Sequence, residues 1–246
     1  MGKKEIAITV KDLHVYYRDM NRFSFKKSGL KGRGTGKIFK AVKGVSFEIP
    51  KGQILGICGK NGSGKSTTLR AISGIFSPDK GSIDLHGNSI SLLSIGVGFQ
   101  KKLTGYENIF LSGLVLGFSY EQIKEKLDEI IEFSELGDFI YKPVRSYSSG
   151  MHSKLAFSIT AILETDIILI DEVLSVGDIH FKQKSYNKMK ELISDDSRTV
   201  VIVSHSSKTL TELCDRVIWL HEGIIKKDGD PKEVMSEYEE FMRVEA

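Results

Sequence analysis

Residues 59–67, with the sequence GKNGSGKST, have the types and the spacing of a loop that binds nucleotide phosphates. They match the pattern G-x-x-x-x-G-K-[ST] in full, between an apolar strand-like run at 54–58 and an apolar helix-like run at 68–76. Glycines let backbone N–H groups curl around a β-phosphate without Cβ clashes. Lys65 supplies positive charge to the β- and γ-phosphates, and the Ser66 hydroxyl can ligate Mg²⁺. The predicted phosphate-binding residues are Gly59, Asn61, Gly62, Ser63, Gly64, Lys65, Ser66 and Thr67.

Two other apolar runs end in residues suited to phosphoryl transfer. Asp171 ends the run IILID, and Glu172 follows it. Beside a phosphate loop, Asp171 is suited to hold the Mg²⁺ shell through water, and Glu172 to polarise an attacking water as general base. His205 ends the run VVIVSH, where it can donate to a γ-phosphate. An acidic turn and a structural histidine are the alternatives, and the nearby phosphate loop favours the functional interpretation.

A second stretch, RSYSSGMHSKLAFS at residues 145–158, also has the composition of an anion-binding helix N-terminus. Small hydroxyl residues and a glycine lead directly into an amphipathic helix, whose first N–H groups and dipole favour negative charge. The chain therefore contains a second candidate phosphate site in addition to the complete loop.

The first third of the chain is predicted to be mostly β. Strand patterns cover residues 6–17 and 42–59, with a turn at 50–52 in the second, and shorter strand patterns cover 81–87 and 89–97. These segments precede and surround the phosphate loop.

Residues from about 103 to 164 are predicted to be helical. Within them, Ser119 and Gln122 have the spacing of a capping box. The following helix has an apolar face of Ile123, Leu127, Ile130 and Ile131. Strands and helices then alternate from 166 to 223, and their continuous apolar strands predict a parallel sheet buried on both faces.

The composition limits the class of protein. A chain of 246 residues with 40% hydrophobic and 27% charged residues is ordinary for one large globular domain. Cys58 and Cys214 lie in separate apolar runs, which predicts buried, reduced thiols. The N-terminus lacks the patterns of a signal peptide and of myristoylation, and no uncharged stretch reaches the roughly 18 residues of a spanning helix.

Positive charge is concentrated in residues 18–40. Eight of the 35 Lys and Arg residues fall in this Gly-rich segment, against one acid, Asp19. A solvated surface loop accounts for such a segment, and so does a patch near anionic lipid head groups or a membrane-bound partner. Nucleic acid is not expected as a partner, because no aromatic-interleaved motif accompanies the charge.

Together with YSSGM at 147–151, these motifs resemble the nucleotide-binding domain of ATP-binding cassette (ABC) transporters, over nearly the whole chain and in the family's order. The resemblance implies that 59–67 is the Walker A loop, that Asp171 and Glu172 are the Walker B pair, and that His205 is the switch histidine. It implies ATP and Mg²⁺ as cofactors. The catalytic residues that it implies are Lys65, Glu172 and His205.

Three further sites follow from the same resemblance. SVGD at 175–178 is similar to the D-loop, which ends at Asp178. Tyr17 matches the aromatic residue that stacks on adenine, with its neighbour Tyr16, or a core role for either tyrosine, as the alternatives. Gln100 fits the Q-loop position that senses Mg²⁺ and faces the transmembrane partner. The metal ligands implied are Ser66, Gln100 and Asp171.

The usual Leu-Ser-Gly-Gly-Gln signature of the family is altered here to Tyr147–Met151. Ser148 and Gly150, the phosphate-facing positions, are retained. The resemblance implies that they contact the nucleotide of a second copy of the chain, in a head-to-tail dimer. The altered signature, with DEVLSVGD and LLSIGVGFQKKLTGYENI, is similar to the ATPases that export cell-surface polysaccharides.

The fold class implied is an α/β P-loop NTPase of ABC type, with a mixed-sheet core, an antiparallel β subdomain and an inserted α-helical subdomain. Residues 1–246 would form a single nucleotide-binding domain. Its catalytic core would comprise 1–100 and 165–246, and its helical subdomain 101–164. No carbohydrate-binding domain is expected after this core, and the membrane partner is expected to set substrate choice.

The function implied is that of the ATP-hydrolysing subunit of an exporter of a lipid-linked glycopolymer of the teichoic acid, O-antigen or capsule type. Its expected partners are a second copy and two polytopic permease subunits, at the cytoplasmic face of the bacterial membrane. The apolar run at 109–118 is either a docking surface for a permease or a buried helix. The alternatives are an ABC ATPase of another transporter, a soluble ABC ATPase acting on nucleic acid or ribosomes, and a non-catalytic scaffold.

Overall fold

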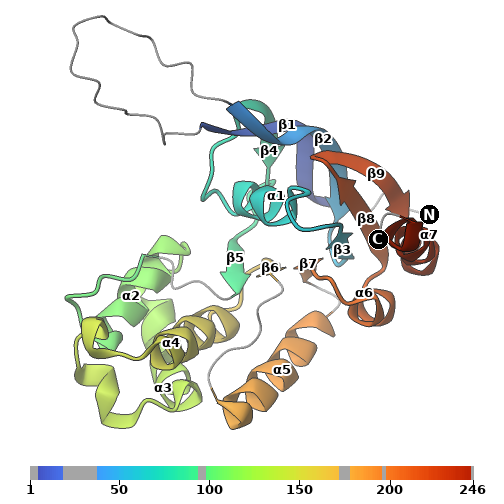
Figure 1. Ribbon diagram of the computed structural model, residues 1–246. Helices are drawn as coiled ribbons and strands as arrows, with labels where there is room; N and C mark the ends of the chain where they lie inside the picture. The colour runs from blue at the N-terminus through green and yellow to red at the C-terminus, as the bar shows by residue number, and fades with distance from the viewer. Residues whose placement is uncertain (1–4, 19–37, 94–97, 172–177, 196–197, 245–246) are drawn as a thin grey trace, which may run out of the picture.

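The strands of the computed structural model, which describes residues 5–18, 38–93, 98–171, 178–195 and 198–244, form two sheets (Figure 1). The smaller sheet is antiparallel, in the order β2-β1-β4. The larger has the order β5-β6-β7-β3-β8-β9. Of its neighbouring pairs, β8–β9 is antiparallel and the others are parallel. The bounds are β1 Ile6–Arg18, β2 Ile38–Pro50, β3 Ile54–Cys58, β4 Lys80–Asp84, β5 Ile90–Leu93, β6 Ile167–Asp171, β7 Thr199–Val203, β8 Arg216–His221 and β9 Ile224–Gly229.

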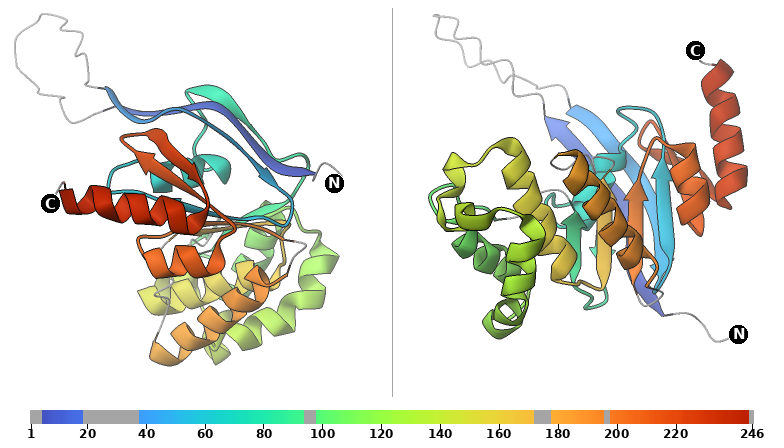
Figure 2. Two further views of the ribbon diagram at one scale, coloured as in Figure 1. Left: turned by 90° about the vertical axis from the view of Figure 1, so that its right-hand side faces the viewer. Right: turned by 90° about the horizontal axis from the view of Figure 1, so that it is seen from below.

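The large sheet is buried on both faces, as its apolar strands predicted. Because successive side chains of a strand point to opposite faces, β6 contributes to two separate cores. Ile167 and Leu169 pack toward the small sheet and α1, whereas Ile168 and Ile170 pack toward the helices on the other face. Figure 2 shows α5 and α6 on the side of the large sheet that is turned away from the small sheet. The bounds are α1 Lys65–Ile72, α5 Ile179–Ile193, α6 Ser207–Leu213 and α7 Pro231–Val244.

Between β5 and β6 the chain forms a group of helices with a core of its own (Figure 1). The predicted capping box is present at α3: the Gln122 N–H donates to Ser119 Oγ at 3.2 Å, and the Ser119 N–H donates to Gln122 Oε1 at 2.8 Å. Of the predicted apolar face, Ile123, Leu127 and Ile130 are buried, and Ile131 is partly buried. The bounds are α2 Gly105–Val115, α3 Tyr120–Ser134, α4 Ser149–Ile162 and the 3₁₀ turns Gly137–Tyr141 and Val144–Ser146.

The first helix of this group, α2, begins with a capping box that was not predicted from the sequence. Thr104 and Glu107 form a second capping box at α2, with the Glu107 N–H donating to Thr104 Oγ1 at 3.1 Å. The division of the chain into a core and a helical subdomain at 101–164 stays a prediction.

Several sequence predictions concern burial and membrane segments. Cys58 and Cys214 are buried free thiols, and burial raises the pKa of each to about 12. Within the described ranges, no helix has both the length and the apolar character needed to cross a membrane. Most of the basic segment 18–40, and the end of the strand predicted at 89–97, lie outside the described residues.

Candidate nucleotide-binding site

The loop between β3 and α1 has a backbone that requires glycine. Gly59 has φ 144°, and a Cβ there would collide with the carbonyl oxygen of Leu220 and lie 2.6 Å from Ser63 Oγ. Gly64 has φ 104°, and its Cβ would lie 2.6 Å from the carbonyl oxygen of Ala41. Any side chain at these two positions would therefore push the loop away from the strands that support it.

The N-terminus of α1 has a glycine cap, which suits an anion site. Its N-cap, Gly64, has no side chain to accept from the first turn, and no side-chain cap forms there. The N–H groups that open a helix lack intrahelical partners and attract anions. Ser63 Oγ is buried and has no hydrogen-bond partner among the described residues. A concave loop with these donors fits a phosphate group.

Lys65, the first residue of α1, is almost completely buried over this loop, with 6% of its surface exposed. Its ammonium donates to the carbonyl oxygens of Gly59 at 2.7 Å and Lys60 at 3.0 Å. The positive charge is thereby held inside the curve of the loop. The thiol of Cys58 lies beneath, where burial raises its pKa although the Lys65 charge acts in the opposite direction.

A cavity of about 300 Å³ opens beside the loop and gathers predicted residues from four separate segments. Of the predicted nucleotide site, it is lined by Tyr17, Asn61, Gly62, Gly64, Lys65, Ser66, Thr67, Asp171 and His205. Phe39, Ala41 and Val203 complete the lining. The residues that two apolar strands carry to their carboxyl ends, Asp171 and His205, therefore meet the phosphate loop, as expected for parallel strands of one sheet.

The two candidate tyrosines lie in different environments. Tyr17 lines the cavity, and its hydroxyl is 3.1 Å from Thr67 Oγ1. Tyr16 does not line it: its hydroxyl is 3.0 Å from His14 Nδ1, and Lys40 Nζ lies 5.5 Å from its ring centroid. Adjacent residues of a strand point to opposite faces, so only one of the pair can face the nucleotide. The geometry favours Tyr17.

Phe39 is a cavity residue that the sequence analysis missed. It is the cross-strand partner of Tyr17 in the β1–β2 pair and is 58% exposed. An exposed aromatic pair of this kind presents two ring surfaces on one side of a sheet. Only the register of the β1–β2 pair could have identified Phe39. That register depends on bulges between the two strands, and the sequence does not reveal them.

The candidate metal ligands are only partly brought together. The Ser66 hydroxyl donates to Asp171 Oδ1 at 3.3 Å. Mg²⁺ is usually held by one or two protein oxygens together with phosphates and waters, and this pair fits that donor set. The described residues contain no cluster of three or more His, Cys, Asp or Glu suited to a metal.

Gln100, the third predicted metal ligand, does not line this cavity in the part of the chain that the structure describes. Its N–H donates to Asn108 Oδ1 at 2.7 Å, and its carbonyl oxygen accepts from Asn108 Nδ2 at 3.1 Å. The buried Asn108 of α2 thus holds the backbone of the predicted Q-loop. Glu172, the predicted general base, lies outside the described residues.

The remaining predicted residues line a different cavity, of about 400 Å³. Ser148, Gly150 and Asp178 form its polar part, with Glu135 and Lys154. Ser148 caps α4 by accepting from the Met151 N–H at 3.2 Å. Asp178 caps α5 by accepting from the Phe181 N–H at 3.0 Å. The predicted signature and the predicted end of the D-loop therefore adjoin each other and are separate from the phosphate loop of the same chain.

A glycine-rich loop between a central parallel strand and a helix, with an aspartate at the end of a nearby strand, defines a P-loop nucleotide-binding protein. The ABC transporter family profile matches residues 42–175, and the chain belongs to this family. Nucleotide binding follows from that membership.

Similar proteins carry export-system names. The chain is 43% identical over 203 residues to the O-antigen export system ATP-binding protein RfbB of Myxococcus xanthus, covering 82% of the chain and 46% of that protein. It is 45% identical over 208 residues to the teichoic acids export ATP-binding protein TagH of Bacillus anthracis, covering 85% and 38%. The TagH of Listeria innocua is 43% identical over 245 residues, covering 99% and 72%. The chain spans less than half of the first two of these proteins.

Among solved structures, a dimeric ATP-binding cassette in a post-hydrolysis state with ADP and Pi superimposes with a TM-score of 0.68 at 22% identity. The match covers 91% of the chain and 98% of that structure. This likeness confirms the predicted fold class, and the names of the relatives confirm the predicted similarity to exporters of surface polymers.

Proposed function

We propose that the chain is the ATP-hydrolysing subunit of a bacterial ABC exporter that moves a lipid-linked surface glycopolymer of the teichoic acid, O-antigen or capsule type. The observation that carries this proposal is the cavity beside the phosphate loop. Of the predicted residues, it gathers Tyr17, most of the phosphate loop, Asp171 and His205 from four segments of the chain, though not Gln100. The names of the relatives supply the cargo class.

In this proposal the residues of the cavity divide the work on ATP. Tyr17 and Phe39 hold the adenine, and the loop N–H groups and Lys65 hold the phosphates. Ser66 and Asp171, with Gln100 as the predicted third ligand, would hold Mg²⁺, which neutralises charge on the phosphate oxygens when bound. Glu172 serves as general base, and His205 contacts the γ-phosphate.

The second cavity supports a catalytic dimer. Ser148, Gly150 and Asp178 lie apart from the Lys65 loop, so they do not complete the nucleotide site of their own chain. Two copies that pair head to tail bring the signature of each chain to the nucleotide of the other. The isologous contact then uses both cavities of both chains.

Glu172→Gln tests hydrolysis and pairing together. The amide still accepts a hydrogen bond from water but is a poor base, so ATP stays bound and the pair stays closed. We expect a dimer that elutes as such only with ATP and Mg²⁺, with phosphate release close to background. A Glu172→Gln variant that hydrolyses ATP at the wild-type rate would exclude Glu172 as general base, and wild-type protein without phosphate release would favour the scaffold alternative.

The proposed permease partners would place the chain at the cytoplasmic face of the membrane. The run at 109–118 is divided: Ile109 is fully buried, whereas Leu114 and Val115 are 52% and 55% exposed. The exposed part supports docking and the buried part supports packing. We expect a polytopic membrane protein to co-purify with the wild-type chain and to be lost in Leu114→Glu. Co-purification with RNA or ribosomes instead would favour the soluble ABC alternative.

The proposed domain organisation assigns 101–164 to a helical subdomain and the rest of 1–246 to the catalytic core. The separate core of the helical group supports it. Limited proteolysis tests the division: a first cut near residue 100 or 165 is expected, and first cuts within α3 or α4 would contradict it.

A further inference from the structure

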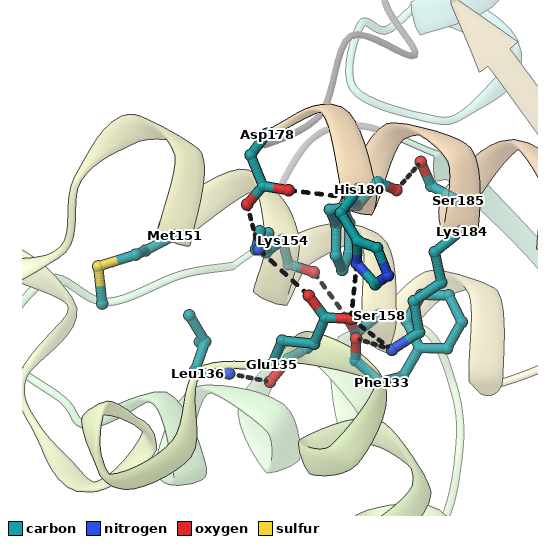
Figure 3. Close-up of polar contacts among 12 residues, drawn as sticks. Phe133, Glu135, Leu136, Met151, Lys154, Ser158, Asp178, His180, Lys184 and Ser185 are labelled. Atoms are coloured by element: carbon teal, nitrogen blue, oxygen red, sulfur yellow. Dashed lines mark hydrogen bonds and ion pairs between the residues drawn. The ribbon is translucent and has the colours of Figure 1, made fainter.

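The signature helix α4 is connected to α5 and to the end of α3 by a network of charges (Figure 3). Lys154 of α4 pairs with Asp178 at 2.7 Å and with Glu135 at 3.4 Å. Its side chain is only 13% exposed, and its ammonium lies 4.9 Å from the centroid of the Phe181 ring. Lys154 of α4 therefore contacts the end of α3 and the start of α5.

Asp178 uses both of its carboxylate oxygens in this junction. Oδ1 accepts from the Phe181 N–H and caps α5, and Oδ2 pairs with Lys154. The hydrogen bond from Lys154, followed by the one from Phe181, lowers the pKa of Asp178 to about 2. The residue that ends the predicted D-loop is thus fixed to the helix that carries the predicted signature.

Glu135 supports Lys154 from the other side. It also pairs with Lys184 of α5 at 2.9 Å, and Lys184 donates in addition to the Phe133 carbonyl oxygen at 3.1 Å. Burial raises the pKa of Glu135, but the hydrogen bonds and charges of Lys184 and then Lys154 outweigh it and leave the pKa lower than usual.

Glu135 has a backbone conformation that is unfavourable for a residue with a side chain. Glu135 is the C-cap of α3 and has φ 55°, in the left-handed region where glycine is favoured. A glycine would relieve the backbone but would leave Lys154 without its second partner. A side chain held in a costly conformation points to a role for the side chain itself.

We propose that Lys154 is a positioning residue for ATP hydrolysis. It holds Asp178 against the first turns of α4, so that Ser148, Gly150 and Asp178 are presented to a partner's nucleotide as one unit. The inference rests on the proposed function, because it concerns a nucleotide bound by a second copy. Lys154 is kept from the phosphates by its two carboxylates and acts through Asp178.

The test compares Lys154→Met with Lys154→Arg and with Lys188→Met in the full chain. Lys188 is a matched control: its side chain is 12% exposed and pairs with Glu191 at 2.8 Å, but within α5 alone. We expect Lys154→Met to lower kcat by about tenfold or more, since misplaced groups are costly in catalysis. Its affinity for ATP, measured on the single chain with a fluorescent analogue, is expected to stay within about twofold, because the Lys65 loop is untouched. Lys154→Arg should recover most of kcat, and Lys188→Met should keep it.

Two further variants extend the test, and the second keeps the proposal falsifiable if Lys154→Met does not fold. Asp178→Asn combined with Lys154→Met should lower kcat no further than the worse single variant, because both act through one contact. Glu135→Gly should keep or raise the melting temperature while it lowers kcat.

Three results would overturn this inference but leave the proposed function standing. They are a wild-type kcat in Lys154→Met, an equal loss of kcat in Lys188→Met, and a kcat that falls only in those variants whose melting temperature also falls. Absence of ATP hydrolysis by the wild-type chain, alone and with its membrane partner, would overturn the proposed function and the inference with it.

Discussion

The N-termini of α1 and α4 both lie in segments that contain glycine and serine, yet they are built differently. The α1 terminus is capped by Gly64 with φ 104°, and no side chain occupies its first N–H groups. The α4 terminus is capped by Ser148 in an extended conformation, and its hydroxyl accepts from the Met151 N–H. One of the first donors of α4 is therefore satisfied by a side-chain cap, whereas α1 has no such cap.

The cations of the two termini differ in the same way. Lys65 donates to the backbone carbonyl oxygens of Gly59 and Lys60 in the α1 loop, which carry no formal charge. Lys154, one and a half turns into α4, is paired with two carboxylates. A phosphate at α1 thus meets a positive charge, and a phosphate at α4 needs that charge from elsewhere. In the proposed function, the α1 terminus holds the phosphates of its own chain's nucleotide, and the α4 terminus contributes to the nucleotide site of a second copy.

The largest effect that this comparison predicts is on ATP affinity in Lys65→Ala. The variant loses charge-assisted hydrogen bonds worth about 1.5–3 kcal/mol each, so ATP should bind about tenfold to a hundredfold more weakly. Calorimetry with the single chain measures this, and Lys80→Ala on the exposed end of β4 serves as control. Unchanged affinity in Lys65→Ala would remove the α1 loop as the phosphate site.

The next prediction is a fall in kcat without a change in ATP affinity. Ser148→Ala should lower kcat by about tenfold, through one lost hydrogen bond to a charged group, and leave the ATP affinity of the single chain unchanged. Ser119→Ala is the matched control, because Ser119 caps α3 with the same 3.2 Å hydrogen bond. Both variants lose a helix cap worth about 1 kcal/mol, so a shared fall in melting temperature is expected. Equal losses of kcat in both would reduce Ser148 to a structural cap.

A smaller effect is expected at the adenine end of the α1 cavity. Tyr17→Ala and Phe39→Ala should each weaken ATP by roughly threefold to tenfold, in keeping with about 0.5–1.5 kcal/mol for an aromatic contact. Tyr16→Ala should leave ATP binding unchanged, since Tyr16 lies outside the cavity. Binding of inorganic triphosphate should be equal in all three variants. A loss for triphosphate as well would show that the rings support the loop rather than the base.

The contrast between the two termini also explains what sequence could and could not predict. The phosphate loop is local: nine consecutive residues with flanking strand and helix contain its pattern, and the structure gathers them with Asp171 and His205. The α4 side depends on contacts between distant segments. The Glu135–Lys154 and Lys154–Asp178 pairs join residues 19 and 24 positions apart. At the α1 cavity, the Tyr17–Phe39 register likewise joins residues 22 positions apart. No periodicity or motif encodes such pairings. The sequence therefore predicted the signature residues but not the charge pairs of Lys154 that connect the signature helix to Glu135 and Asp178.

The smallest effect is a difference in pH dependence between the two sides. Burial raises the pKa of Cys58, next to the α1 loop, from 9.0 to about 12, so its thiol stays protonated in the folded chain when the unfolded chain has ionised. Its share of stability is present below pH 9 and is lost as the pH rises through about 12. Asp178, on the α4 side, has its pKa lowered from 3.8 to about 2, so its share is present above pH 3.8 and is lost as the pH falls through about 2. The free energy of unfolding, measured with denaturant at a series of pH values, should therefore change less steeply with pH above 9 in Cys58→Ala. In Asp178→Asn it should change less steeply below pH 3.8. The opposite pairing of slope and variant would contradict the assignment.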